Sequence, residues 1–492
     1  MTDNEPKTTP PAERPVPQER TAVTRHKVAI GGQEVAYTAT AGTLILHEED
    51  DKEGKAARPK AEIFFVAYTR DDTADAGARP LTFSFNGGPG SSSVWLHLGA
   101  LGPRRVVMPD GPVAPPPPYR LVDNEYALLD VTDLVFIDPV TTGYSRTIPE
   151  EKPEQFHDFQ KDIESVGEFI RLYTTRYQRW RSPKFLIGES YGTTRAAGLA
   201  GHLLERHGLY LNGVMLISSI LNFQTAIPNP GNDLPYILFL PTFTATAWYH
   251  RQLAPELQQD LGATLREVEA FAYGPYNLAL MQGDALPEAE RAAVAEQLAR
   301  YTGLSREYVE QTNLRINIHR FVKELLRRQH RTVGRLDSRY MGIDRDAVGE
   351  WAEYDPSYAA IQGVYTAMLN DYMRGELTFE SDLPYEILTD RVRPWRYEQH
   401  QNQYVNVAET LRKAICQNPQ LKVFVANGYY DLATPYLATA YTLDHLGLDA
   451  SLRGNLSLGY YEAGHMMYVH GPALAQLKAD LAGFLAAAIS EG

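Results

Sequence analysis

The chain has 492 residues, 44% of them hydrophobic, and a formal net charge of -14. This acidic balance argues against nucleic-acid partners and against an anionic membrane surface, and we find no apolar stretch near the roughly 18 residues of a membrane span. The only cysteine, Cys416, excludes an internal disulfide and any cysteine-based metal cluster. A chain of this length and composition can hold one large α/β core with an insertion.

The N-terminal segment, residues 1–21, holds five prolines, many charges and no aromatic residue, and we expect a disordered tail. It shows no apolar core of a signal peptide, which favours a cytoplasmic location, or a secreted or periplasmic one if a signal peptide has been removed. The single cysteine fits a reducing compartment, although secreted bacterial proteins can also lack disulfides.

Residues 22–227 are expected to form the first part of an α/β core. The pair Gly31-Gly32 lies between the runs 27–30 and 34–37, which is typical of an antiparallel hairpin. Further strands are expected at 43–47, 61–68, 81–85, 134–138, 184–187 and 214–217, and helices at 156–179 and 193–207. Because strands and helices alternate after the hairpin, we expect a mostly parallel central sheet with antiparallel strands at its N-terminal edge.

Residues 228–376 interrupt this alternation with an almost wholly helical pattern. Helices are expected at 254–272, 287–301, 306–329 and 358–373. A helical block of this length is an insertion, and its simplest position is a cap over the active edge of the sheet. Residues 377–492 then complete the core, with a helix at 405–416, strands at 422–426 and 456–461, and a final helix at 471–489.

The stretch 184–192 combines a strand with the pattern Gly-x-Ser-x-Gly, and a helix follows it. This arrangement is typical of a nucleophile elbow, in which Ser190 occupies a strained turn and the flanking glycines let neighbouring backbone pass closely. The N-terminus of the helix offers N–H groups and a positive dipole to a developing oxyanion. The motif alone is weak, so the residues around it have to support it.

An α/β-hydrolase fold places its catalytic triad in the order Ser, acid, His at the C-terminal ends of strands. Two acids, Asp431 and Glu462, follow the later strands; Glu462 lies just before the candidate histidine, so Asp431 is the better acid. His465 lies between the last strand and the last helix, where the base belongs, whereas His470 lies closer to the helix start and suits a cap. Ser190 needs a base for its proton, and the base needs a buried carboxylate to fix its tautomer.

Four short motifs mark the ends of predicted strands. They are Asn86-Gly87-Gly88-Pro89-Gly90-Ser91-Ser92-Ser93, Asp138-Pro139 with Gly143-Tyr144-Ser145, Gly188-Glu189-Ser190-Tyr191-Gly192, and Gly464-His465-Met466. Together they resemble the serine carboxypeptidase family (peptidase family S10), and the resemblance spans roughly residues 81–470. The first and third motifs in combination are highly specific, whereas Gly-Gly-Pro-Gly alone indicates a tight turn.

The resemblance implies a role for each residue of the reaction centre. Ser190 is then the nucleophile, His465 the base and Asp431 the acid that orients the base. The N–H groups of Gly88 and Tyr191 would form the oxyanion hole. The position of Tyr191 directly after the nucleophile independently agrees with this role.

For substrate binding, the resemblance implies that Asn86, Gly87 and Glu189 hold the terminal carboxylate of a peptide. A glutamate that binds a carboxylate has to be protonated, and the family achieves this with a second glutamate, which raises one pKa and suits acidic pH. In this chain the partner position holds Ala100. His97, about one turn earlier, is an alternative source of positive charge or a plain packing histidine. Without the pair, we expect optimal activity near neutral pH.

The sequence therefore predicts a serine carboxypeptidase that releases the C-terminal residue of peptides through an acyl-enzyme. The alternatives are an esterase or acyltransferase on the same triad, which the missing second glutamate favours, and an idle binding protein, which the retained triad disfavours. A metal enzyme is poorer still, because His202 and His207 lie five residues apart on one helix, about 140° around its axis, and do not converge. We expect a peptide or small acyl substrate, and no cofactor, metal, nucleic acid or membrane. The oligomeric state stays open, with a homodimer as one option.

Overall fold

The computed structural model describes residues 18–48 and 58–490 of the chain. The expected disordered tail, residues 1–21, lies mostly outside this range. Its last residues do not: the Thr43 N–H donates to the Arg20 carbonyl oxygen at 2.9 Å, and Thr21 is the first residue of strand β1. The described core therefore begins a few residues earlier than expected, because the backbone there already pairs with the next strand.

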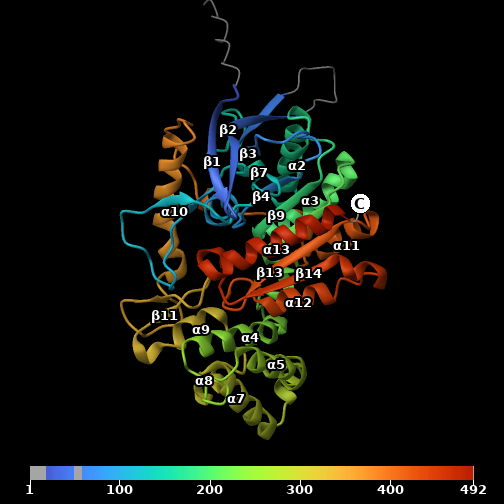
Figure 1. Cartoon of the computed structure of the whole chain (residues 1–492). Coiled ribbons are helices and arrows are strands. Elements are labelled where there is room, and N and C mark those ends of the chain that lie inside the picture. Colours follow the sequence, from blue (N-terminus) through green and yellow to red (C-terminus); the bar gives the residue numbers. More distant parts are fainter. Residues whose placement is uncertain (1–17, 49–57, 491–492) are drawn as a thin grey trace, which may run out of the picture.

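Ten strands of the described chain form one sheet (Figure 1). They are β1 Thr21–Ile30, β2 Gln33–Glu48, β3 Arg58–Arg70, β4 Leu81–Phe85, β7 Asp133–Ile137, β8 Arg146–Thr147, β9 Lys184–Ser190, β10 Gly213–Ser219, β13 Lys422–Gly428 and β14 Leu456–Tyr461. Their order is β1-β2-β3-β7-β4-β9-β10-β13-β14, with β8 paired to β3. The pairs up to β3–β7 and β3–β8 are antiparallel, and all pairs from β7 to β14 are parallel. The expected sheet of an α/β-hydrolase fold is confirmed.

Successive residues of the central strands point to opposite faces of the sheet, and each face has its own apolar core. On one face, residues such as Leu186 and Val425 pack with helices α2 Phe159–Arg176, α3 Tyr191–His207 and α11 Ala408–Gln417. On the other face, Ile187 and Phe424 pack with α10 Pro356–Gly375 and α13 Gly471–Ser490. The sheet is buried on both sides, which explains the uninterrupted apolar runs of its strands.

Among the described helices, α13 alone is long and apolar enough, by length and composition, to cross a membrane. The expectation that the chain has no such stretch is wrong for α13. Its apolar side is nevertheless the side that covers the sheet, where Leu474, Leu477, Leu481 and Leu485 are buried. This burial is the pattern of a helix that packs on a sheet core.

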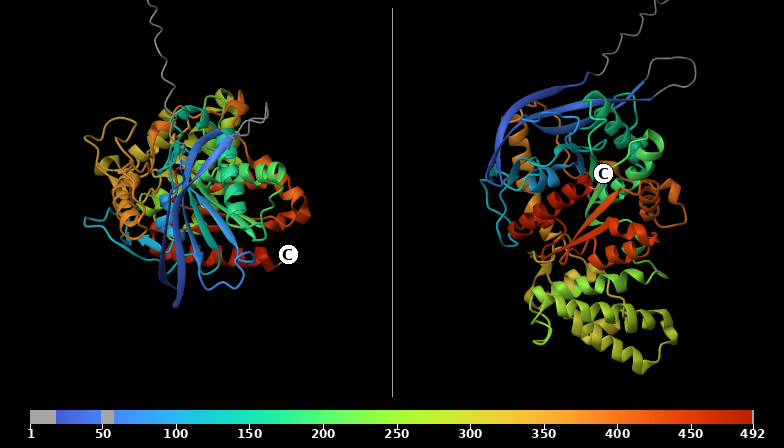
Figure 2. Two further views of the ribbon diagram at one scale, coloured as in Figure 1. Left: turned by 90° about the horizontal axis from the view of Figure 1, so that it is seen from above. Right: turned by 45° about the vertical axis from the view of Figure 1, so that its right-hand side comes forward.

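The insertion begins with a group of helices that we call the helical lobe (residues 234–333). Its helices are α4 Leu234–Tyr249, α5 Leu261–Phe271, α6 Asn277–Gln282, α7 Glu288–Thr302, α8 Arg306–Gln311 and α9 Ile318–Glu324. Figures 1 and 2 show the lobe beyond β13 and β14, at the end of the molecule opposite the N-terminal strands. Phe243, Leu298 and Phe321 belong to an apolar core that lies almost wholly inside the lobe and also includes Leu432 of the sheet domain. Helix α10 lies apart from it, against the main core.

Helix α4 is absent from the expected elements. Pro235 and Pro241 suggest a break, and no amphipathic period marks the helix because it is buried on most sides. Phe243 faces the lobe core, whereas Leu238 packs with α12 Tyr436–Asp444 of the main core. Helix α4 therefore lies between the lobe core and the sheet domain and packs against both.

Other elements differ from the expected ranges. The single helix expected at 306–329 is divided into α8 and α9, because Asn313 and Leu314 have positive φ values of 53 and 64 between them. The helix expected at 254–272 begins only at Leu261, and the strands expected at 34–37 and 43–47 form the one strand β2. Short elements complete the description: α1 Val94–Leu96, followed by a π-helical turn at His97–Leu101, β5 Arg104–Val106 paired with β6 Leu121–Asp123, and β11 Thr332–Val333 paired with β12 Met341–Gly342.

Candidate active site

Strand β9 runs directly into helix α3, and Ser190 lies at the junction with φ 59 and ψ -130. This is a strained backbone conformation for a residue with a side chain. Close backbone contacts require the glycines on both sides. A Cβ on Gly188 would lie 2.1 Å from the Gly192 carbonyl oxygen, and a Cβ on Gly192 would lie 2.8 Å from the Phe85 carbonyl oxygen. The backbone thus has the geometry of a nucleophile elbow.

The glycine segment after β4 lies against this elbow, because β4 and β9 are parallel neighbours. A Cβ on Gly87 would lie 2.5 Å from the backbone nitrogen of Tyr191 and 2.7 Å from that of Gly192. Gly88 has a φ of +99, in the left-handed region that favours glycine. The loop that carries Gly88 is therefore in direct contact with the start of α3, where the N–H groups of the helix are free of intrahelical partners.

Asp431 and His465 follow the neighbouring parallel strands β13 and β14, and their side chains meet. The Nδ1 atom of His465 lies 2.7 Å from Oδ2 of Asp431, and both side chains are buried. Asp431 is held by Thr434, whose hydroxyl donates at 2.6 Å and whose backbone N–H donates at 3.0 Å. Burial lowers the pKa of His465, but the Asp431 carboxylate outweighs it, so that this pKa lies above its usual value.

The main chain of His465 is fixed by two further contacts. Its N–H donates to the Leu336 carbonyl oxygen at 2.6 Å, and its carbonyl oxygen accepts from the Ser218 hydroxyl at 2.6 Å. Leu336 belongs to the insertion, and Ser218 ends strand β10. Thr434 has a sequence signal, an Asp-x-x-Thr turn, whereas a backbone carbonyl such as that of Leu336 has none.

The alternative acid, Glu462, and the alternative base, His470, are not part of this arrangement. Glu462 is exposed, and among the described residues its one hydrogen-bond partner is Arg339, which donates to the Glu462 carbonyl oxygen at 3.1 Å. His470 directly precedes α13, as expected for a residue at a helix start, and it does not line the cavity that contains Ser190.

Glu189 lies beside Ser190 and is buried. Its Oε1 atom accepts from the Asn86 side-chain nitrogen at 2.9 Å, whereas its Oε2 atom has no hydrogen-bond partner among the described residues. Burial raises the pKa of Glu189 to about 7, against the opposing effect of His465. Asn86 is itself fixed, because its Oδ1 accepts from the Leu96 N–H at 3.1 Å and its carbonyl oxygen accepts from Arg195 at 2.6 Å. The carboxyl is thus oriented and neutral in acid.

His97 does not supply the positive charge considered for it. The side chain is 2% exposed, its Nε2 lies 2.6 Å from the Tyr68 hydroxyl, and its ring stacks on Phe136 with centroids 4.3 Å apart. Burial lowers its pKa to about 3. His97 is therefore a neutral packing histidine. Ala100, 2% exposed, belongs to the same apolar core as Phe136 and carries no carboxyl group.

One cavity of about 310 Å³ joins the elbow to the other candidate residues. Ser190, His465, Glu189, Asn86 and the loop that includes Gly87 and Gly88 line it. The insertion contributes Arg335, Leu336, Asp355, Tyr358 and Ile361. Asp431 and Tyr191 are buried behind this surface. The structure therefore brings together every residue that the sequence analysis proposes for the site.

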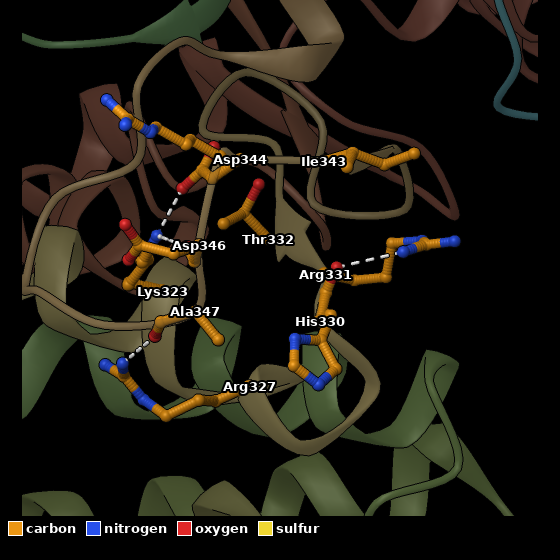
Figure 3. A pocket seen from close by; sticks show the side chains of 10 residues that line it. Lys323, Arg327, His330, Arg331, Thr332, Ile343, Asp344, Asp346 and Ala347 are labelled. Carbon is orange, nitrogen blue, oxygen red and sulfur yellow. Dashed lines mark hydrogen bonds and ion pairs between the residues drawn. The ribbon is translucent and has the colours of Figure 1, made fainter.

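A different cavity, of about 170 Å³, lies between α9 and the loop after β12 (Figure 3). Two of the cations that line it, Lys323 and Arg327, have partners in the following loop. Lys323 Nζ contacts Asp344 Oδ2 at 2.5 Å and the Asp346 carbonyl oxygen at 2.9 Å, and Arg327 donates to the carbonyl oxygens of Ala347 and Gly349. These contacts connect the lobe to the following loop. The described residues that line this cavity do not include a nucleophile in contact with a base.

The histidines of α3 are closer together than their spacing suggests. The ring centroids of His202 and His207 lie 5.3 Å apart, so the two rings are in contact although they lie five residues apart on the helix. His207 occupies the last turn of α3, directly before the left-handed Gly208, and its ring makes an edge contact with that of His202. Within residues 18–48 and 58–490, no group of three or more His, Cys, Asp or Glu side chains is placed to hold a metal ion.

Comparison with known proteins gives consistent results. A family model described as serine carboxypeptidase matches residues 54–455. The chain is 34% identical over 160 residues to the pheromone-processing carboxypeptidase KEX1 of Saccharomyces cerevisiae, a match that covers 31% of this chain and 20% of KEX1. It is 32% identical over 177 residues to serine carboxypeptidase-like 33 of Arabidopsis thaliana, covering 35% of this chain and 33% of that protein. The matched part thus spans a third or less of either relative.

A solved structure of KEX1(Δ)p from Saccharomyces cerevisiae has the same fold, with a TM-score of 0.56, 17% sequence identity and 91% of each chain covered. The sheet order, the elbow after β9 and the acid–histidine pair after β13 and β14 define an α/β-hydrolase. Because the family model matches most of its length, the chain belongs to the serine carboxypeptidase family.

Proposed function

We propose that this protein is a serine carboxypeptidase that hydrolyses the C-terminal residue of peptides through an acyl-enzyme on Ser190. The observation that carries the proposal is the cavity in which the Ser190 elbow, the base of the 2.7 Å Asp431–His465 pair and the Asn86–Glu189 pair meet. The first two features supply nucleophilic catalysis, and the third supplies a place for a terminal carboxylate.

In the proposed reaction, Asp431 accepts the Nδ1–H of His465 and leaves Nε2 free to take the proton of Ser190. The Ser190 oxygen then attacks the carbonyl carbon of the last peptide bond. The N–H groups of Gly88 and Tyr191 donate to the developing oxyanion. His465 returns the proton to the leaving amine, and a water molecule, activated by His465 in the same way, releases the acyl group.

Recognition of the free C-terminus is assigned to Asn86, Gly87 and Glu189. Because burial raises its pKa to about 7, Glu189 keeps its proton in mildly acidic and near-neutral solution and can donate a hydrogen bond to a carboxylate. Asn86 contributes its side-chain amide, and Gly87 its backbone N–H. A substrate without a free carboxylate leaves these polar groups without a partner.

The insertion, residues 228–376, is proposed to cap the cleft. Support comes from the five cavity residues between Arg335 and Ile361 and from the contact of the Leu336 carbonyl oxygen with the His465 N–H. The helical lobe itself lies farther out, so only the later part of the insertion narrows the cleft. A cytoplasmic location stays a prediction, with a secreted or periplasmic location as its alternative; the free, exposed Cys416 is compatible with a reducing compartment.

The test compares a blocked dipeptide that has a free carboxylate with its C-terminal amide and its methyl ester. We expect the free carboxylate to be preferred. Ser190→Ala should lower turnover by a factor on the order of 10³ or more without loss of the fold, and a fluorophosphonate should label Ser190 only. Equal or better turnover of the blocked ends would instead support an esterase or acyltransferase, and labelling at another serine would overturn the assignment of the nucleophile.

A further inference from the structure

Two buried polar atoms near the reaction centre have no hydrogen-bond partner among the described residues: Oε2 of Glu189 and the hydroxyl oxygen of Tyr468. Both side chains are 3% exposed. Burying such an atom without a partner costs about 1–3 kcal/mol, so two of them in one region point to a shared function. The two side chains lie close enough for each to shift the pKa of the other, and Asn86 acts on the pKa of both.

Tyr468 reaches this position from the turn that follows His465. It lies in the short 3-10 helix Met467–Val469, and its ring packs against Gly99, where an added Cβ would lie 2.4 Å from Tyr468 Cε2. Gly99 directly precedes Ala100, the position that leaves Glu189 without a second carboxyl. The phenol ring of Tyr468 therefore packs beside the residue that precedes Ala100.

We infer that Tyr468 is the positioning residue of Glu189, taking the place of a carboxyl partner. Its phenol O–H donates to Oε2 of Glu189, while the Asn86 amide donates to Oε1. With both oxygens accepting, the one proton of neutral Glu189 points away from both donors and into the cavity, toward the terminal carboxylate of a peptide. This inference rests on the proposed carboxypeptidase function.

A phenol differs from a second carboxyl in one respect that matters here. Burial raises the pKa of Tyr468 well above its usual value, so the phenol stays neutral over the whole working range and only donates. The proton that decides binding therefore always resides on Glu189. Recognition of the substrate carboxylate then does not require two acids to share a proton, as it would in a carboxyl pair.

The charged and titratable groups around Glu189 determine its pKa, and so the pH at which it loses its proton. Burial raises the pKa of Glu189 and Asp431 raises it further, whereas His465, the Asn86 amide and the nearby phenol of Tyr468 lower it. Tyr365 is a further buried phenol in the same region. Tyr468 also lines a cavity of about 280 Å³ together with Asp110 and Arg105, and Arg105 pairs with Glu125 at 3.2 Å. Since the phenol lowers the pKa of Glu189, its removal should raise that pKa.

The kinetic test is Tyr468→Phe, which keeps the ring that packs on Gly99. For a peptide with a free carboxylate we expect KM to rise about tenfold with little change in kcat, and the alkaline limb of kcat/KM to move to higher pH. The C-terminal ester of the same peptide should be turned over as by the wild type. Tyr365→Phe is the matched control, because it removes a neighbouring buried phenol that has no hydrogen bond to Glu189, and it should change neither quantity.

A spectroscopic test does not depend on turnover. In the Ser190→Ala protein, infrared difference spectra against Ser190→Ala with Glu189→Gln isolate the carboxyl band of Glu189, which can be titrated. Adding Tyr468→Phe should shift this band and move its midpoint to higher pH. An unchanged band and midpoint would overturn the role of Tyr468. If instead the wild type shows no preference for free carboxylates while the band does shift, the proposed function fails and the Tyr468–Glu189 contact stands.

Discussion

At the scale of single residues, the active site requires two buried groups to hold opposite protonation states. His465 has to be neutral to take the proton of Ser190, and its pKa lies above the usual value. Glu189 has to be protonated to bind a carboxylate, and burial raises its pKa to about 7. The two conditions overlap only in a narrow range of pH, and each group acts on the other.

We therefore predict a narrow, bell-shaped dependence of kcat/KM on pH for peptides with a free carboxylate, centred near neutrality. The neutral fraction of His465 gives the acid limb, and the protonated fraction of Glu189 gives the alkaline limb. An ester substrate without a carboxylate should retain the acid limb and lose the alkaline limb that Glu189 causes. The prediction is checked by pH profiles of both substrates, and a peptide optimum more than about one pH unit below the usual histidine pKa of roughly 6.5 would contradict it.

Arg335 is the residue through which the insertion acts on His465 by charge. It lines the cavity, its side chain has no ion pair or hydrogen bond with the described residues, and its positive charge lowers the pKa of His465. Arg335→Gln should raise that pKa and move the acid limb of kcat/KM to higher pH, and the shift should shrink in high salt because Arg335 is exposed. Arg393→Gln is the control, since Arg393 lines the same cavity but pairs with Asp390 at 2.9 Å. A limb that responds equally to both substitutions would argue against a specific effect of Arg335.

At the scale of elements, the junction of β9 and α3 depends on backbone contacts that exclude any side chain. A methyl group at Gly188 would come within 2.1 Å of the Gly192 carbonyl oxygen, and neither segment can yield without displacing Ser190. Gly188→Ala should therefore destabilise the protein by more than about 2 kcal/mol and lower kcat/KM strongly.

The control for this substitution is Gly483→Ala in the interior of α13, where an added Cβ meets nothing within 4 Å. A helix interior favours alanine over glycine, so Gly483→Ala should be neutral or stabilising by up to about 1 kcal/mol. Thermal unfolding and kcat/KM of the two variants give the measurement. Similar stability and activity of both would mean that the elbow tolerates a side chain.

The same elements show what sequence patterns can predict. The buried strands, the Gly-x-Ser-x-Gly turn and the order Ser190, Asp431, His465 follow from local periodicity and from the topology of a parallel sheet. Helix α4 escapes such a prediction because a helix enclosed on most sides has no amphipathic period. Tyr468 and the Leu336 carbonyl oxygen escape it because their contacts with Glu189 and His465 exist only in three dimensions.

At the scale of the whole molecule, ionisation of the buried Glu189 carboxyl lowers the free energy of unfolding as the pH rises. The pKa of Glu189 is raised from 4.5 in the unfolded chain to about 7 in the folded protein, so the folded state holds the proton more tightly between these values. Stability is therefore unaffected by this group below about pH 4.5 and falls as the pH rises toward about 7. Fully developed, the loss is on the order of 3 kcal/mol.

Glu189→Gln should remove this loss, because glutamine does not titrate. Relative to the wild type, the variant should be more stable at pH 8 than at pH 5, which chemical denaturation at the two pH values measures. The difference between the two pH values cancels any change in packing. Glu205→Gln replaces an exposed carboxyl on α3 and should show no such difference. A stability gain of Glu189→Gln that is independent of pH would contradict the raised pKa.

The insertion is divided at residue 333 into the helical lobe and the segment that lines the cleft. This division affects how proteins related to this one can diverge. The helical lobe packs around its own core on α4, which meets the sheet domain at Leu432. Its loops and outer helices contribute none of the described residues that line the cavity containing Ser190, so they can be lengthened, shortened or exchanged without changing the lining of that cavity. Residues 334–361 are different, because Leu336 holds the main chain of His465 and its neighbours line the cleft. A chimera joined after residue 333 would inherit the substrate preference of the parent that supplies 334–361, whichever parent supplies the lobe.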